Sequence, residues 1–258
     1  MIGEFAALMT AVVWSGTSIA FSEASVRVGT MYVNVTRMFM AIIMLLITIL
    51  VLNIEISLSI TQIGNLAISG FIGLVFGDTF LFKAYRSIGP RISMLLMALA
   101  PAIAAFMAFV FLDEDLSLWG VAGIGVTIIG ITLVVLKREE KPTSHYKIDY
   151  IGIFYAFLGA VGQAVGLIFA KFAINEGEIN GFVANFMRLF SAIIILWPIA
   201  IFTRRYQKPW QVFKKDKKAL YATITGSVLG PYIGITLSMI SITYAKVGIA
   251  STIMAMPP

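Results

Sequence analysis

The chain has 258 residues, of which 59% are hydrophobic and 12% are charged, and its formal net charge is +6. Soluble domains contain about 25% charged residues, so this composition excludes an ordinary water-soluble fold and indicates a protein that lies in a lipid bilayer. The chain has no cysteine, which excludes disulfides, thiolate nucleophiles and cysteine-based metal sites.

Apolar windows of about 20 residues, the length that crosses a bilayer, predict membrane-spanning helices along the whole chain. In chain order these windows cover residues 2–23, 31–52, 61–83, 91–112, 117–136, 150–173, 181–202 and 219–243. A ninth window begins near Gly248 and runs to the last residue given. The connections are short except for 137–147 and 203–219, and the first of these divides the chain into two halves.

The two halves repeat one another in sequence. NVTRMFMAII (34–43) aligns with NFMRLFSAII (185–194), so that Arg37 corresponds to Arg188. IGEFAALMTA (2–11) likewise aligns with IGIFYAFLGA (151–160). A repeat with an odd number of helices, five in the first copy, must enter the membrane from opposite sides in its two copies. The sequence therefore predicts an all-α integral membrane protein with two inverted five-helix repeats, an architecture of secondary transporters.

The domain boundaries follow from the repeat. We expect a first repeat at 1–137, a linker loop at 138–149 and a second repeat at 150–258 that stops within its fourth helix. Pro258 corresponds to Pro101, after which the first repeat continues for about 35 residues, so repeat symmetry predicts a full chain of roughly 293 residues. On this expectation the fold has ten helices, and about one and a half of them are missing from this chain.

Basic residues gather at alternate connections. Of the 19 lysines and arginines, 15 lie at the first, third, fifth and seventh connections, and seven of these fall between Arg204 and Lys218. The second, fourth and sixth connections are acidic instead, with Glu55, DED at 113–115, Glu176 and Glu178. Because positive loops stay inside, we expect the odd connections in the cytoplasm, the Met1 end outside, and a multi-pass position in the cell (plasma or inner) membrane.

Three stretches resemble EamA-type members of the drug/metabolite transporter superfamily. They are AVVWSG (11–16), the glycine-rich block from Ser87 to Val135 that includes Pro101 and Glu114, and VGIASTIMAMPP (247–258). The resemblance implies ten helices in two inverted repeats around a central cavity. It also implies the movement of small polar metabolites, amino acids or drugs, commonly outward. Many members are drawn with a cytoplasmic N-terminus, which is the opposite of the orientation that the loop charges favour.

We therefore predict a transporter of small metabolites that exports its substrate by alternating access and uses no cofactor. The expected partners are a small-molecule substrate and the lipid bilayer, with no nucleic acid, and a homodimer is allowed. The alternatives are a lipid-linked or nucleotide-sugar-type substrate, or a non-transporting membrane scaffold or sensor. The chain has no Walker, HExxH or GxSxG motif and no clustered metal ligands, so an enzyme or a metal site is not expected.

Charged residues inside the spans are costly and need a partner or a function. Arg37 and Asp78 are expected at similar depth in neighbouring helices, so we predict an ion pair that is either a structural lock or a proton-coupling carboxylate. Arg188 repeats Arg37, but Ile235 stands where the partner of Arg188 would be. Arg188 therefore either extends toward the glutamates of the sixth connection or binds an anionic group of the substrate.

Other polar and amphipathic side chains within the spans need a cavity or an interhelical hydrogen bond. Together with Arg188, the candidate substrate-binding residues are Trp14, Gln163, Asn34, Asn185 and Tyr232. Pro101 and Pro231 lie inside apolar runs and predict helix kinks, which can border a cavity. Glycines spaced four apart, such as Gly73 and Gly77, predict closely packed helices.

Overall fold

The computed structural model describes residues 1–115 and 149–255, together with scattered positions between 118 and 133. All of the regular structure in this part of the chain is helical, as predicted. Among the described residues, six helical stretches are long and apolar enough to cross a membrane: Ile2–Val28, Thr30–Val51, Ile60–Phe111, Tyr150–Asn175, Gly181–Phe202 and Lys217–Tyr244. The predicted spans in the described residues are thus confirmed as helices.

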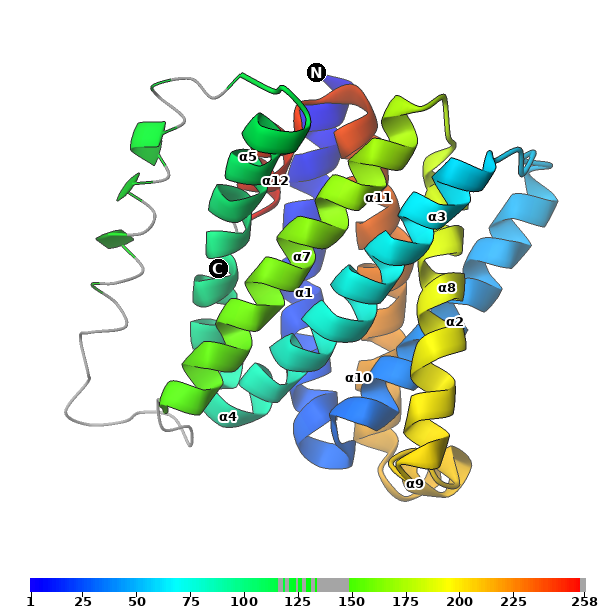
Figure 1. The fold of residues 1–258 in the computed structure, drawn as a ribbon. Helices are drawn as coiled ribbons and strands as arrows, with labels where there is room; N and C mark the ends of the chain where they lie inside the picture. Colours follow the sequence, from blue (N-terminus) through cyan, green and yellow to red (C-terminus); the bar gives the residue numbers. More distant parts are fainter. Residues whose placement is uncertain are drawn as a thin grey trace.

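The elements follow the order of the two halves (Figure 1). The first half contains α1 (Ile2–Val28), α2 (Thr30–Val51), α3 (Ile60–Ser69), the π-helix η1 (Gly70–Gly77), α4 (Asp78–Met97) and α5 (Leu99–Phe111). The second contains α7 (Tyr150–Asn175), α8 (Gly181–Phe202), α9 (Pro209–Lys215), α10 (Lys217–Ser227), the π-helix η2 (Val228–Gly234), α11 (Ile235–Tyr244) and α12 (Val247–Met254). The predicted span 117–136 and the linker 138–149 lie largely outside the described residues.

The long stretch Ile60–Phe111 is divided by a sharp bend inside α4. Gly89 has φ 80° and ψ 166°, a conformation that favours glycine, and Pro90 has no backbone N–H to continue the helical ladder. The stretch therefore forms two spans, and the bend falls between the predicted spans 61–83 and 91–112. Gly29, with φ 94°, separates α1 from α2 in a similar way.

The structure corrects the prediction of a basic loop at 203–219. This connection contains the short helix α9, and α10 begins immediately after it at Lys217. Pro209 occupies the start of α9, where a missing N–H is tolerated. Asp216 caps α10 by accepting a hydrogen bond from the backbone N–H of Ala219 at 2.9 Å. A seven-residue basic helix gives no apolar window, which is why hydropathy alone misses it.

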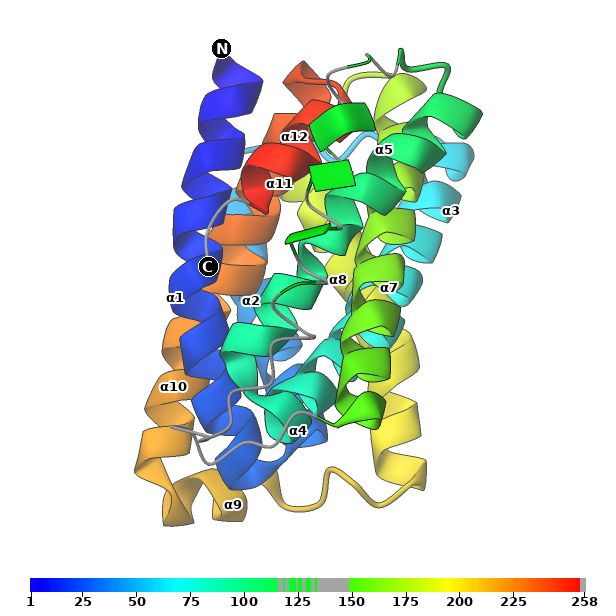
Figure 2. The same cartoon turned by 90° about the vertical axis from the view of Figure 1, so that its left-hand side faces the viewer.

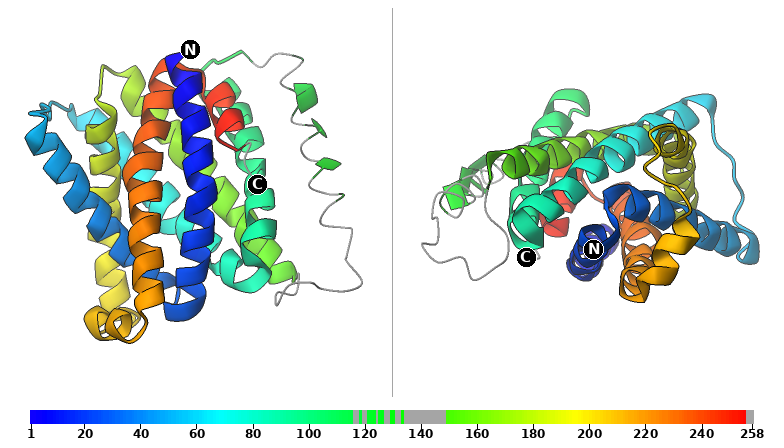
Figure 3. Two further views of the ribbon diagram at one scale, coloured as in Figure 1. Left: turned by 180° about the vertical axis from the view of Figure 1, so that it is seen from behind. Right: turned by 90° about the horizontal axis from the view of Figure 1, so that it is seen from below.

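Helices of the two halves pack against each other rather than forming separate domains. Helix α1 contacts α10, η2, α11 and α12 of the second half, and Figure 3 shows it beside α10 and α11. In the same way α7 contacts α3, η1, α4 and α5 of the first half (Figures 1 and 2). The remaining contacts between halves include α2 with α8 and α5 with α12.

Glycines bring α7 and η1 into backbone contact. A Cβ atom added to Gly162 would lie 2.7 Å from the Cα of Gly77, and one added to Gly166 would lie 2.9 Å from the Cα of Gly73. Real Cβ atoms do not approach other atoms so closely, so this contact depends on glycine in both helices. The close packing predicted from glycine spacing is confirmed here.

Candidate functional site

A cavity of about 120 Å³ lies between helices of both halves. Its wall includes residues of α1, α2, η1, α4 and α5 from the first half and of α7, α8, η2, α11 and α12 from the second. Most of the lining is apolar or aromatic, with Phe21 and Tyr85 among its larger side chains. Among the described lining residues, those that carry a charge are Arg37, Asp78 and Arg188. An apolar pocket with a few converging polar groups is typical of a small-molecule site.

Arg37 of α2 is buried, with only 4% of it exposed, and it makes contacts on several sides. Its Nη2 donates to Oδ2 of Asp78, the first residue of α4, and its Nε donates to Oδ1 of Asn34 at 2.9 Å. The guanidinium also lies over the rings of Phe82 and Phe21, at 4.9 and 5.4 Å from their centroids. The predicted ion pair is present, and the ring contacts add cation–π attraction to it.

Arg188 of α8 is equally buried but lacks a carboxylate partner among the described residues. Only 3% of it is exposed, its Nη1 points at the sulfur of Met239 at 3.4 Å, and its Nε has no hydrogen-bond partner. Ile235, at the position that corresponds to Asp78, also lines the cavity. Glu176, one of the glutamates considered as an alternative partner, instead accepts from the Ser59 hydroxyl at 3.4 Å.

A second polar atom without a partner lies near Arg188. Oε1 of Gln163, on α7, is buried and has no hydrogen-bond partner in the described structure. A Cβ atom built on Gly73 would lie 3.2 Å from Nη2 of Arg188 and 3.7 Å from Oε1 of Gln163. Because Gly73 has no side chain, the Arg188 guanidinium, a donor, and Oε1 of Gln163, an acceptor, border the same space. Trp14, which corresponds to Gln163 in the repeat, also lines the cavity.

The remaining candidates make interhelical hydrogen bonds and are not among the cavity-lining residues. Asn34 donates to the hydroxyl of Thr79 at 3.2 Å. Asn185 donates to the carbonyl of Pro231 at 2.7 Å and to the hydroxyl of Thr236 at 2.9 Å. Tyr232 shares a hydrogen bond of 2.8 Å with the hydroxyl of Thr48. Polar groups within spans are expected either to line a cavity or to form interhelical hydrogen bonds, and these three residues form interhelical hydrogen bonds.

The two prolines lie where the helices are irregular. Pro101 lines the cavity in the first turn of α5, just after the interruption at Ala98, and Pro231 lies inside η2. The carbonyl of Pro231 is satisfied by Asn185 rather than left free. The π-helices η1 and η2 end at corresponding glycines, Gly77 and Gly234. Short π segments within α-helices are frequent at functional sites.

A comparison with models of known protein families matches residues 1–136 and 150–258 to the EamA-like transporter family. The chain belongs to the EamA-like transporter family. The match comes in two parts that coincide with the two halves and leaves out the connection between them. A search of curated proteins finds no match to the chain.

Membership of the EamA-like family makes this chain a multi-pass membrane transporter rather than an enzyme, and it confirms the resemblance seen in the sequence. Glu114, in the most characteristic of the resembling stretches, joins two helices of the fold. Its carboxylate accepts from the backbone N–H of Val247 at 3.0 Å and of Gly248 at 3.5 Å, at the start of α12. Among the described residues, no group of three or more acidic, histidine or cysteine side chains could hold a metal ion.

Sequence reasoning did not identify several residues that line the cavity of this EamA-like protein. They include Phe21, Phe82, Tyr85, Met94, Met97, Ser238, Ser251 and Met254. Apolar lining residues stand out poorly in a chain that is mostly apolar. Phe82 and Tyr85, however, follow Asp78 by four and seven residues, which places all three on one helix face. This spacing is the sequence feature that could have indicated that Phe82 and Tyr85 lie near Asp78.

Proposed function

We propose that the chain transports a small organic anion, such as a carboxylate-bearing metabolite, through this cavity, and that Arg188 binds the anionic group. The observation that carries the proposal is the charge of the cavity wall, which has two buried guanidinium groups and one carboxylate. Because Asp78 pairs with Arg37, no carboxylate among the described residues forms an ion pair with Arg188, and the charged groups of the described wall sum to one positive charge. A substrate carboxylate supplies a counter-ion and can accept two parallel hydrogen bonds from the guanidinium.

Other lining residues suit the rest of such a substrate. Oε1 of Gln163, which has no protein partner, can accept a hydrogen bond from a donor on the bound molecule. Trp14, Phe21 and Tyr85 offer aromatic surface to its apolar part. Arg37 and Asp78 hold each other in place at the edge of the same space, so that they shape the site while the charge of Arg188 stays available.

The proposed mechanism is alternating access between two inverted repeats, with export as the proposed direction. Three correspondences support the repeat: α1 and α7 pack in the same way against the opposite half, η1 and η2 end at matched glycines, and the Asn34–Thr79 bond matches the Asn185–Thr236 bond. Because the backbones of α7 and η1 are in contact without intervening side chains, the two helices could move against each other during such a change. We place the basic connections in the cytoplasm, following the charge rule.

The experiment that tests this function is a thermal-shift screen of the purified protein in detergent. Organic anions should raise the melting temperature, because a ligand stabilises the state that it binds. Their neutral amides or methyl esters, as matched controls of nearly the same shape, should not. Anions that stabilise the protein are then tested for transport in reconstituted vesicles. Binding without transport would favour a sensor, and stabilisation by the neutral analogues alone would exclude an anion site.

A further inference from the structure

One end of the bundle carries a strongly basic surface formed by α9 and the residues on either side of it, which we call the α9 surface. Its basic residues are Arg204, Arg205, Lys208, Lys214, Lys215, Lys217 and Lys218. All of them are exposed, and none takes part in any of the ion pairs found among the described residues. Seven exposed cations therefore lie within fifteen residues of sequence, and none of them forms an ion pair in the part of the chain that the structure describes.

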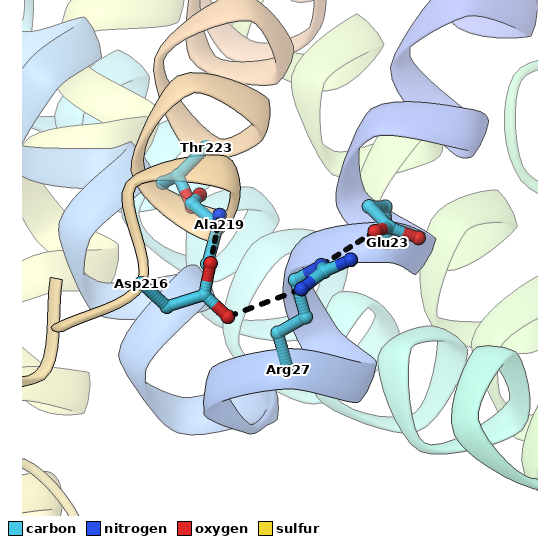
Figure 4. A network of polar contacts seen from close by, with 5 residues as sticks. All are labelled: Glu23, Arg27, Asp216, Ala219 and Thr223. Carbon is cyan, nitrogen blue, oxygen red and sulfur yellow. Dashed lines mark hydrogen bonds and ion pairs between the residues drawn. The ribbon is translucent and has the colours of Figure 1, made fainter.

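The single acidic residue of this segment is bound by groups other than these cations. Asp216 accepts from the backbone N–H of Ala219, and it also pairs with Arg27 of α1 at 3.3 Å (Figure 4). Arg27 in turn pairs with Glu23 at 2.5 Å. The Ala219 N–H and the Arg27 guanidinium lower the pKa of the Asp216 carboxyl. Asp216 thus joins the ends of α1 and α10, and among the described residues it forms no ion pair with the α9 surface.

The position of α9 places these charges at the level of lipid headgroups. The helix lies at the lower end of the bundle in Figures 1 and 2, transverse to α8 and α10. It connects the ends of the apolar spans Gly181–Phe202 and Lys217–Tyr244. Its Phe213 is buried against the bundle, with 5% exposed, whereas Trp210 is 76% exposed. Tryptophan is enriched at the interface between membrane and water, where its ring lies among the headgroups.

We propose that the α9 surface binds the anionic headgroups of the surrounding phospholipid, with Trp210 placed among them. A transverse helix with one buried aromatic, one exposed aromatic and two lysines in its last turn resembles the helices that lie in the interface plane. Lysine and arginine next to the last apolar turn of a span are attracted to an anionic leaflet, and each such residue strengthens attachment roughly fivefold. The bound lipid then fixes α9, and through Asp216 the adjacent ends of α1 and α10.

Quenching of Trp210 fluorescence by brominated lipids tests this proposal on the whole chain in lipid nanodiscs. The Trp210 signal is the difference between the native protein and Trp210→Phe, because the chain has four tryptophans. Brominated phosphatidylglycerol should quench this signal more strongly than brominated phosphatidylcholine at the same mole fraction. The preference should weaken as salt is raised from 0.05 to about 0.5 M, because salt screens exposed charges.

Two matched variants test whether the preference of the Trp210 signal for phosphatidylglycerol depends on the α9 surface. Lys214→Gln with Lys215→Gln should reduce the preference for phosphatidylglycerol by about tenfold or more. Arg86→Gln with Arg91→Gln removes the same charge from exposed positions next to the α4 bend and should leave the Trp210 preference nearly unchanged. Soluble glycerol phosphate and a DNA duplex, added at constant ionic strength, should not displace the lipid.

Equal quenching by the two lipids would overturn the proposal, as would a preference that survives loss of the lysines. Displacement of the lipid by the DNA duplex at constant ionic strength would identify a nucleic-acid surface instead. Displacement by glycerol phosphate would identify a site for soluble phosphate. Because all seven basic residues are exposed, the lysine variants should fold, and the salt titration of the unmodified protein provides an independent readout.

Discussion

Arg37 and Arg188 occupy corresponding positions in the two halves and line one cavity, but of the two only Arg37 pairs with a carboxylate in the described structure. The partner of Arg37 is Asp78, and the second half has Ile235 at the matching position. On our proposal this difference separates two roles: the first arginine is fixed within the protein, and the second is left for the substrate. The repetition of the arginine and the loss of one partner then have the same explanation.

The Arg37–Asp78 pair should be essential for folding stability. Arg37→Ala should lower the free energy of unfolding by about 3–5 kcal/mol, because the buried carboxylate of Asp78 is left without a counter-ion. Unfolding in mixed detergent micelles measures this loss. The double variant Arg37→Gln with Asp78→Asn should recover part of it. If the losses of the single variants Arg37→Gln and Asp78→Asn simply add in the double variant, the two residues do not interact.

The backbone contact between α7 and η1 should tolerate no side chain. In Gly166→Ala the new Cβ would lie 2.9 Å from the Cα of Gly73, so we expect a loss of about 1–3 kcal/mol from overpacking. Gly64→Ala is the matched control, because it adds the same methyl group to the helix α3 with nothing within 4 Å. It should be neutral or stabilising by up to about 1 kcal/mol. Equal melting temperatures for the two variants would contradict this packing.

The carboxylate of Glu114 should stabilise the start of α12. Glu114→Ala removes the acceptor for the backbone N–H of Val247 and should lower stability by about 0.5–2 kcal/mol, as the loss of a helix cap does. The neighbouring Asp115 has a side chain that is 96% exposed, and its ion pair with Lys246 should contribute little. Asp115→Asn is therefore the control, and a larger loss for it than for Glu114→Ala would refute the capping role.

The α9 surface should face the cytoplasm. Because the chain contains no cysteine, Lys215→Cys and Glu178→Cys each introduce a single reactive thiol. An impermeant maleimide added to intact cells should label the cysteine at position 178 and spare the one at 215, and opened cells should label both. The reverse pattern would invert the orientation and agree with the N-terminus that is commonly drawn for the family.

The sequence predicts the spans and the Arg37–Asp78 pair because both depend on large energies: a bilayer requires about 20 apolar residues, and a buried charge requires a partner. It does not predict α9, which is short and basic, or the π-helices, for which no simple residue pattern exists. The placement of Asn34 and Tyr232 outside the cavity wall depends on how the helices rotate against one another. Hydrophobic periodicity is nearly absent where most faces are apolar, so that rotation could not be derived.

The central claim is that Arg188 binds the anionic group of the substrate, and anion transport by Arg188→Lys in reconstituted vesicles tests it most directly. The variant should melt close to the native protein yet lose transport, because an ammonium group cannot make the paired hydrogen bonds of a guanidinium. Glu176→Gln with Glu178→Gln should transport at the native rate. If Arg188→Lys instead transports at the native rate, the substrate does not need the paired hydrogen bonds of the guanidinium and the claim is wrong.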